Sequence, residues 1–185
     1  MPRKPAICVY CGSSPGNDAA YMEAATAVGK TVAQRGARLI YGAGDAGLMG
    51  ATARAALEAG GEVIGVVPHV LAGMEGRTDV NTTLIRTETM HERKKVMFAN
   101  ADAFLVLPGG PGTLDETIET LTWRQLGLHE KPLVFVDVNG YWTRLLDLFA
   151  HFSDQGFMRA RFHGFYSVAG TPEEAVDTAL AGIGG

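Results

Sequence analysis

The segment best suited to chemistry is the glycine-rich turn PGGPGT at residues 108–113. It follows the apolar run 103–107 and precedes a segment of helical character. Glycine lets the backbone approach a ligand closely, and the first N–H groups of a helix lack intrahelical partners and lie at its positive end. The turn therefore predicts an anion site, most naturally for phosphate. A tight turn that is needed only for its geometry is the alternative.

The turn differs from two common phosphate-binding fingerprints. No G-K-[ST] follows the glycines, so this is not a Walker A loop, and the G-x-G-x-x-G spacing is absent. A dinucleotide site is therefore unsupported.

Three carboxylates follow the turn, at Asp115, Glu116 and Glu119. Thr113 and Glu116 fit a T-x-x-E capping box, in which the glutamate only satisfies a backbone N–H. A carboxylate beside a phosphate is electrostatically unfavourable, which favours a functional use such as holding a hydroxyl or a water. Capping and catalysis both remain open for Glu116. Asp115 faces about 100° away from Glu116 on a helix.

The densest basic cluster is TMHERKK at residues 89–95. Its T-x-x-E start is a capping box, which predicts that a helix begins here. Arg93 and Lys94 then point about 100° apart, and a solvated basic face is the ordinary interpretation of such a charge run. His91 has no partner His or Cys at ligand spacing, so no metal site is predicted.

Two more glycine-rich segments follow predicted strands. YGAGDAGLMG at 41–50 contains Gly44, and CGSSPG at 11–16 offers the hydroxyls of Ser13 and Ser14. Close backbone approach to a ligand at a helix N-terminus is one interpretation of the first segment. A turn with helix packing through its later glycines is an equal alternative, and ordinary loop serines are the alternative for the second.

The two cysteines, Cys8 and Cys11, form a C-x-x-C. Redox motifs place such cysteines where a helix begins. Here the surrounding AICVYC predicts a strand, in which residues three apart point to opposite faces. A zinc site would need two more ligands at suitable spacing. Structural cysteines are predicted, with Cys11 at a strand end where it can line a pocket.

Apolar runs alternate with helix-like segments along the chain. The runs are apolar nearly throughout, as expected for strands that are buried on both faces. The predicted strands are 6–11, 38–42, 62–68, 103–108, 132–138 and a less regular 164–169. The predicted helices are 18–35, 48–59, 89–99, 113–127, 141–155 and 172–182. Residues 69–82 are expected to form a long irregular segment.

This alternation predicts an α/β fold: a doubly wound, Rossmann-like parallel sheet with helices on both faces, in three layers. Residues 1–185 are predicted to form a single domain, since no linker or repeat divides them. Ligands of such sheets bind beyond the carboxyl ends of the strands. The loops that follow the strands are therefore the places to expect a site.

The composition restricts the partners. The net charge of −4 and the pI near 5.7 argue against broad nucleic-acid binding, which relies on basic surface. No apolar run approaches the roughly 18 residues of a membrane span. The apolar stretch near the N-terminus is too short for a signal-peptide core. We expect a cytoplasmic protein without nucleic-acid or membrane partners.

The motifs PGGPGTLDE (108–116) and MHERK (90–94) together resemble the paired signature of the Lonely guy family, P-G-G-x-G-T-x-x-E with an upstream M-H-x-R-K. Nearly the whole chain takes part, because VYCGSSPG, YGAGDAGLMG, IGVVPHVL and NGYWTRLLDLF match family stretches in the same order. Family members are cytokinin riboside 5′-monophosphate phosphoribohydrolases, often mislabelled lysine decarboxylases. Ala43 stands where the family usually has a third glycine.

The resemblance implies a nucleotide-binding domain that hydrolyses the N-glycosidic bond of AMP or an N6-substituted adenosine 5′-monophosphate, without a cofactor or metal. The products are the free base and ribose 5-phosphate. Arg93 and Glu116 are the implied catalytic pair. The residues expected at the nucleotide are Gly109, Gly110, Pro111, Gly112, Thr113, Lys94, Met90, Glu75, Thr122, Ser14 and Gly44. Members form homodimers with the site near the subunit interface.

Two other functions compete with this one. A non-catalytic nucleotide or molybdenum-cofactor carrier of the same superfamily shares the phosphate loop, but it has no reason to keep Arg93 and Glu116 together. A pyridoxal-phosphate lysine decarboxylase needs a lysine that holds its cofactor as a Schiff base. No lysine here stands in a recognisable setting for that role. The sequence does not determine the preferred N6 substituent.

Overall fold

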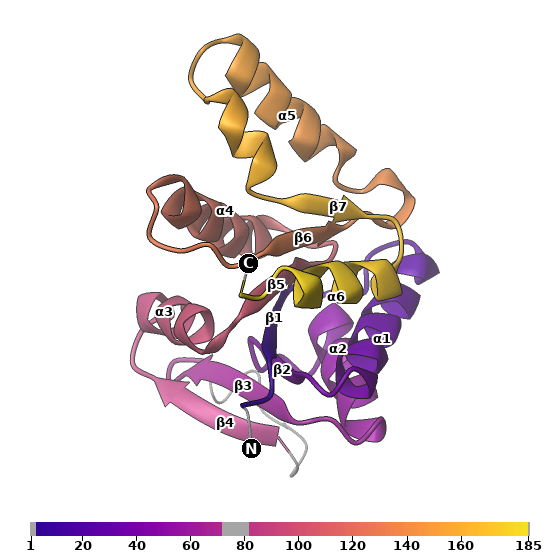
Figure 1. Cartoon of the computed structure of the whole chain (residues 1–185). Helices are drawn as coiled ribbons and strands as arrows, with labels where there is room; N and C mark the ends of the chain where they lie inside the picture. Colours follow the sequence, from indigo (N-terminus) through magenta and orange to yellow (C-terminus); the bar gives the residue numbers. More distant parts are fainter. Residues whose placement is uncertain (1–2, 72–81, 185) are drawn as a thin grey trace.

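The computed structural model describes residues 3–71 and 82–184, which form a parallel sheet covered by helices (Figure 1). The strand order is β4-β3-β2-β1-β5-β6-β7, and all neighbouring strands are parallel. The strands are β1 (Ala6–Tyr10), β2 (Arg38–Tyr41), β3 (Val63–Pro68), β4 (Thr82–Thr87), β5 (Ala103–Val106), β6 (Leu133–Val136) and β7 (Ser167–Ala169).

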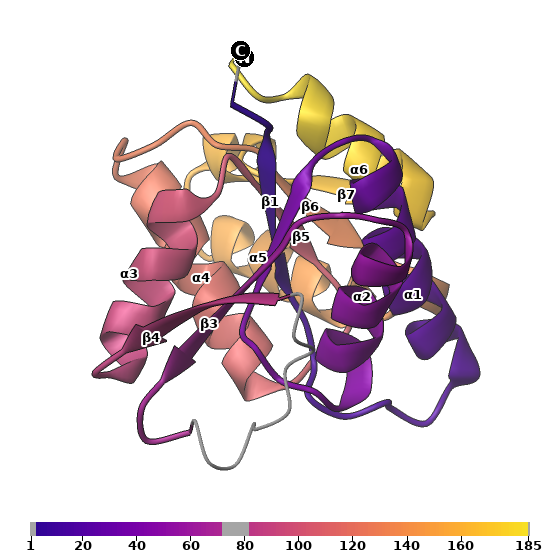
Figure 2. The same cartoon turned by 90° about the horizontal axis from the view of Figure 1, so that it is seen from below.

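Helices cover both faces of the sheet, and Figure 2 shows the three layers edge-on. One face carries α1 (Ala19–Gln34), α2 (Gly47–Glu58) and α6 (Pro172–Ala181), and the other carries α3 (Met90–Asn100), α4 (Pro111–Gln125) and α5 (Thr143–Asp154). Two 3₁₀ turns, η1 (Val138–Gly140) and η2 (Ala160–Gly164), complete the described elements. The predicted doubly wound α/β fold is confirmed.

The direction in which successive strands are added to the sheet reverses between β1 and β5, and this reversal makes a topological switch point there. From β1 the chain winds outward through β2 and β3 to β4, then returns to place β5 on the other side of β1. The loops that follow the neighbouring strands β1 and β5 therefore lead to opposite faces of the sheet, to α1 and α4 respectively. Such a switch point is where doubly wound sheets bind ligands.

The core consists of two apolar clusters, one on each face of the sheet. Successive β1 residues alternate between them, with Ile7 and Val9 in one and Cys8 and Tyr10 in the other. Cys11 belongs to the cluster opposite Cys8. Both cysteines are buried and free, which confirms the prediction that they point to opposite faces and pack structurally.

One strand was not predicted. The expected irregular segment 69–82 falls largely on residues 72–81, which lie outside the described residues, but β4 begins at Thr82. Its sequence, TTLIRT, is only partly buried because β4 lies at the edge of the sheet. An edge strand lacks the continuous apolar run of a central parallel strand, so that signal was absent.

Helices α1 and α2 approach each other closely at Gly29. A Cβ atom built on Gly29 would lie 2.0 Å from the carbonyl oxygen of Thr52, which is backbone and cannot rotate away. Gly29→Ala is therefore expected to lower the free energy of unfolding by about 1–3 kcal/mol through overpacking, although alanine is the better helix former. Urea denaturation measures the change.

Glu23→Ala, at an exposed position of the same helix, is the control and should change stability by about 0.5 kcal/mol or less. A Gly29→Ala protein as stable as wild type would contradict the close contact.

Candidate active site

A cleft of about 570 Å³ opens at the carboxyl end of the sheet, at the switch point. Its walls are the loop after β1, the first turn of α2, the start of α3 and the loop and first turns of α4. The predicted site residues that line it are Ser14, Met90, Arg93, Lys94, Gly109, Gly110, Pro111, Gly112, Thr113 and Glu116. The fold thus brings together three motifs that are far apart in the sequence.

The glycine-rich turn has a closed side and an open side. A Cβ on Gly109 would lie 2.1 Å from Thr113 Oγ1 and 2.9 Å from the Gly12 nitrogen, so only glycine lets these two loops pack backbone against backbone. At Gly110 and Gly112 a Cβ would meet nothing within 4 Å. The protein's own packing therefore does not require glycine at those two positions. The open space at both positions leaves room for a ligand, which favours the phosphate site over a purely geometric turn.

Helix α4 begins at Pro111, two residues before the predicted start. Its N-cap is Gly110, which has no side chain to cap the first turn. The expected capping box of Thr113 and Glu116 is therefore wrong: Thr113 is buried against Gly109, and Glu116 lies beyond the first turn. The first-turn N–H groups receive no side-chain cap, and Gly112 and Thr113 of this turn line the cleft, where an anion can bind.

Arg93 is buried, and the prediction of a solvated basic face is wrong for this residue. The Thr89 hydroxyl accepts a hydrogen bond from the Glu92 N–H, so the predicted cap starts α3 and turns Arg93 inward. Arg93 Nε donates to the carbonyl of Val66 at 3.1 Å, and Nη2 donates to the carbonyl of Gly42 at 2.9 Å. A buried guanidinium needs such partners to offset its desolvation.

Glu116 meets Arg93 inside the cleft, with Oε1 3.7 Å from Arg93 Nη1. The two side chains are 12% and 9% exposed, so they form a nearly buried ion pair. Burial raises the pKa of Glu116 to about 7, against the opposing effect of Arg93. Asp115 raises this pKa further. A carboxyl group that titrates near neutral pH can exchange protons during a reaction at pH 7.

Lys94 forms ion pairs with two further carboxylates on α4. Its Nζ lies 2.9 Å from Asp115 Oδ2 and 3.2 Å from Glu119 Oε2. Burial acts to lower the pKa of Lys94, but its hydrogen bonds to the two carboxylates outweigh burial and raise the pKa. Asp115 is 61% exposed while Glu116 is almost buried, as their predicted 100° separation requires. Lys94 thus joins α3 to α4 beside the catalytic candidates.

Two predicted residues, Gly44 and Thr122, do not line the cleft, and a third is not described. A Cβ built on Gly44 would lie 2.7 Å from Met49 Cε, and Met49 itself lines the cleft. Thr122 lines a separate groove along α4. Glu75 lies outside the described residues.

The 41–50 glycine segment serves mainly packing. A Cβ on Gly47 would lie 2.3 Å from the backbone of Ser13, and one on Gly50 would lie 2.0 Å from the Asp45 carbonyl oxygen. The N–H groups of Leu48 and Met49 donate to the Gly12 carbonyl, so this helix start is already satisfied. The packing alternative therefore describes these later glycines.

Several cleft residues were not predicted, notably Tyr21, Met49 and Tyr141. The Tyr141 hydroxyl donates to the carbonyl of Gly109 at 2.7 Å and so braces the glycine-rich turn. Tyr141 stands in NGYWTRLLDLF, a motif already noted, which could have signalled it. Tyr21 packs edge-on against Tyr141, but no local pattern distinguished it from an ordinary helix residue.

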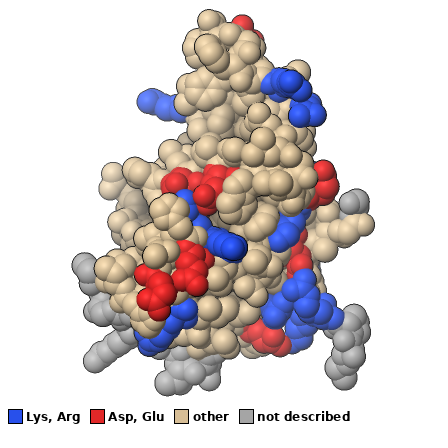
Figure 3. Space-filling model, turned by 90° about the vertical axis from the view of Figure 1, so that its left-hand side faces the viewer, with Lys and Arg blue, Asp and Glu red and all other residues tan. Residues whose placement is uncertain are grey.

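Surface charge shows no single-sign patch on the α3 and α4 side. Figure 3 shows acidic and basic side chains interspersed there. Within the described ranges, no group of three or more His, Cys, Asp or Glu side chains is arranged to hold a metal ion. None of the helices in that part of the chain is long and apolar enough to cross a membrane.

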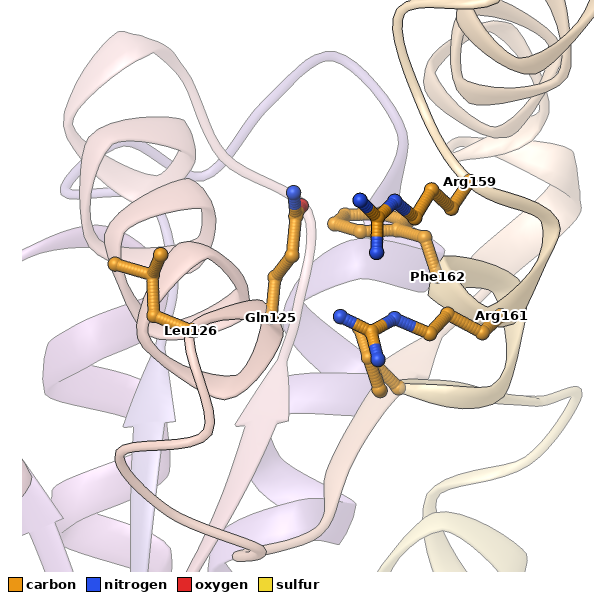
Figure 4. Close-up of a pocket in the computed structure, with 6 residues that line it drawn as sticks. Gln125, Leu126, Arg159, Arg161 and Phe162 are labelled. Carbon is orange, nitrogen blue, oxygen red and sulfur yellow. The ribbon is translucent and has the colours of Figure 1, made fainter.

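A smaller pocket of about 230 Å³ lies away from the cleft, between the end of α4 and η2. Figure 4 shows the guanidinium groups of Arg159 and Arg161 directed toward Gln125, with Phe162 beside them. None of the predicted site residues lines this pocket.

The doubly wound sheet, with a cleft at its switch point, defines a Rossmann-like α/β fold. The model of a family described as "possible lysine decarboxylase" matches residues 49–179. Cytokinin riboside 5′-monophosphate phosphoribohydrolase LOG5 of Arabidopsis thaliana is 40% identical over 168 residues, which cover 90% of this chain and 74% of that protein. The probable enzyme LOGL1 of Oryza sativa subsp. japonica is 44% identical over 155 residues, 83% of this chain and 69% of that protein. The chain belongs to this phosphoribohydrolase family.

Solved structures confirm the fold. The molybdenum cofactor carrier protein of Chlamydomonas reinhardtii has a TM-score of 0.74 and 23% identity, with 97% of this chain and 98% of that chain covered. The molybdenum cofactor binding protein of Rippkaea orientalis has the same TM-score at 21% identity, with 98% of each chain covered. At such identities the likeness concerns the fold alone.

The raised pKa of Glu116 predicts how stability depends on pH. Its protonated form is favoured in the folded state, so its contribution is complete below about pH 4.5 and is lost as the pH rises through about 7. Glu116→Gln cannot ionise, so the variant does not undergo this loss of stability at high pH. The free energy of unfolding of the variant minus that of wild type should therefore increase by about 3 kcal/mol between pH 4 and pH 8.

Denaturant unfolding at a series of pH values measures this difference, and the subtraction cancels the other titrating groups. A difference that stays constant with pH would contradict the buried setting of Glu116.

Proposed function

We propose that this protein hydrolyses the N-glycosidic bond of an adenosine 5′-monophosphate, either AMP or a cytokinin riboside 5′-monophosphate. The products are the free base and ribose 5-phosphate. The observation that carries the proposal is the buried pair of Arg93 and Glu116 beside the open glycine-rich turn. The names of relatives about 40% identical support the same reaction.

The substrate is held by its phosphate in this account. The 5′-phosphate binds the uncapped first turn of α4, where the open faces of Gly110 and Gly112 leave room for it. Ribose then extends from the phosphate toward Glu116, which lies farther along the same helix. Because the phosphate is remote from the bond that breaks, its binding energy can orient the reacting carbon.

Glu116 acts at the ribose. Cleavage of the bond between C1′ and the base nitrogen passes through an oxocarbenium-like state, which a nearby carboxylate stabilises. The carboxylate also accepts a proton from the attacking water, whose oxygen bonds to C1′. The bonding electron pair leaves with the base, which takes up a proton. A pKa of about 7 leaves a substantial fraction of Glu116 ionised at neutral pH.

Arg93 keeps this carboxylate usable. Without a positive neighbour, burial would hold Glu116 protonated at neutral pH, and Arg93 opposes that effect. Its fixed guanidinium also orients the carboxylate across the cleft. Arg93 can additionally help the departing base.

Lysine decarboxylation fits the site poorly, despite the description of the family. Among the described residues, Lys94 is the lysine that lines the cleft. A Schiff-base lysine must lose its proton easily, whereas Asp115 and Glu119 hold Lys94 as an ammonium.

The second candidate is a non-catalytic carrier of a nucleotide or molybdenum cofactor, because the solved structures with the same fold include proteins named as molybdenum cofactor carrier and binding proteins. A carrier gains nothing from a buried carboxylate whose pKa is raised to about 7 beside an arginine.

Turnover separates these candidates. The protein is incubated with AMP and with N6-isopentenyladenosine monophosphate, and chromatography detects the released base. Glu116→Gln should lower kcat by about 10²–10⁴-fold, the usual contribution of a general base, and Arg93→Ala should abolish turnover. Asp115→Asn, at the exposed neighbouring position, is the control and should stay within about tenfold of wild type.

Turnover that survives Glu116→Gln unchanged would exclude this mechanism. Tight nucleotide binding without release of base from either substrate would favour the carrier.

A homodimer is the second part of the proposal. A groove of about 570 Å³ runs along α4 next to the cleft and shares Pro111 and Asp115 with it. Ile118, which is 38% exposed, and Thr122 line this groove. A second copy seated there would bring its surface to the edge of the cleft. It would also account for the expectation that Thr122 contacts nucleotide, although Thr122 does not line the cleft of its own chain.

Ile118→Glu should therefore dissociate the dimer, because a charge in an apolar interface is costly to desolvate. Analytical ultracentrifugation is expected to give twice the 19.6 kDa chain mass for wild type and a single chain mass for the variant. Val168→Glu, at a similarly exposed apolar position on β7, should remain dimeric. A monomeric wild type would contradict the dimer.

A further inference from the structure

The Arg93 guanidinium is held on all three of its nitrogens. Nε donates to the carbonyl of Val66 on β3, Nη2 donates to the carbonyl of Gly42 after β2, and Nη1 faces Glu116. Two of these partners are main-chain carbonyls, which cannot change rotamer. The position of the guanidinium is therefore set by the backbone at the ends of β2 and β3.

Gly42 also leaves space for the Arg93 guanidinium, because it has no side chain. A Cβ built on Gly42 would lie 1.9 Å from Arg93 Nη2 and 3.0 Å from Cζ. Its φ lies outside the left-handed region, so its backbone conformation is open to any residue. A side chain is excluded there mainly because the guanidinium occupies its space, since the next neighbour, Met49 Sδ, would lie farther away, at 3.3 Å.

The next residue completes the turn. Ala43 has φ 60°, in the left-handed region that residues other than glycine seldom adopt. It is 1% exposed and belongs to the core cluster, beside Gly65 of β3. A buried residue held in this conformation indicates that surrounding packing imposes the turn.

We propose that Gly42 is a positioning residue for the reaction: its missing side chain and its carbonyl hold the Arg93 guanidinium against Glu116. Gly42 itself does not line the cleft, so it acts through Arg93. The proposal rests on the proposed function for its catalytic consequence, but the placement of Arg93 can be tested without turnover.

The first test measures kinetics. In Gly42→Ala the methyl group displaces the guanidinium, so kcat should fall about 10–100-fold, while KM should change less than about threefold because the phosphate cradle is untouched. Gly164→Ala is the matched control, since its Cβ would meet nothing within 4 Å and its φ is not left-handed. Equal kcat for wild type and Gly42→Ala would overturn the proposal.

The second test follows the Glu116 carboxyl directly by ¹³C NMR, with its signal assigned from Glu116→Gln. Displacement of Arg93 removes a nearby positive charge, so Gly42→Ala should raise the titration midpoint by about 1 pH unit or more. Gly42→Ala leaves the other titratable groups that interact electrostatically with Glu116 unchanged. These groups are Lys94, Asp115, Glu119, Cys8, Cys11 and Tyr10.

The same substitution in an Arg93→Ala background separates positioning from a general structural effect. Gly42→Ala should then leave the midpoint of Glu116 unchanged, because the group it displaces is gone. If Gly42→Ala lowers the free energy of unfolding, it should lower it less in the Arg93→Ala background than in the wild-type background, for the same reason. An equal shift of the midpoint, or an equal loss of stability, in both backgrounds would overturn the proposal.

These outcomes are distinguishable from failure of the proposed function. A wild-type protein without hydrolase activity would contradict the reaction, while the titration would still decide whether Gly42 positions Arg93.

Discussion

The structure of the cleft depends on one buried ion pair, Arg93 with Glu116. A guanidinium inside a protein must find acceptors, and a carboxylate there must find positive charge. Arg93 provides the positive charge for Glu116, and Glu116 is one of the acceptors for Arg93. This pairing requires that α3 and α4 lie at a fixed distance and that the carbonyls of Val66 and Gly42, at the ends of β3 and β2, point toward Arg93. The position of the helices and the strand ends is thus coupled to the chemistry.

The topology of the sheet places the glycine-rich turn, the proposed anion site, next to that pair. Because β5 returns beside β1, the glycine-rich turn and the loop after β1 meet at the switch point and pack backbone to backbone through Gly12 and Gly109. The cradle for an anion and the carboxylate are then on one helix, α4. In the proposed function, a phosphate bound at the turn directs the ribose toward Glu116 on the same helix.

Much of this was predictable from sequence, for identifiable reasons. Central parallel strands are continuous apolar runs, so β1, β5 and β6 were evident, whereas the half-exposed edge strand β4 was not. The proposed phosphate site was predicted from a glycine-rich turn before a helix. The capping box at Thr113 was wrong because α4 starts earlier, at Pro111. The role of Gly42 depends on its contact with the distant Arg93, which no local pattern encodes.

The most direct test of the central claim is a crystal structure of Glu116→Gln with AMP bound, since this variant should bind the nucleotide without cleaving it. The account predicts the 5′-phosphate on the first-turn N–H groups of α4, with C1′ facing residue 116 and Arg93 beside it. It would be contradicted by a phosphate bound elsewhere, for example between Arg159 and Arg161, or by a ribose turned away from residue 116.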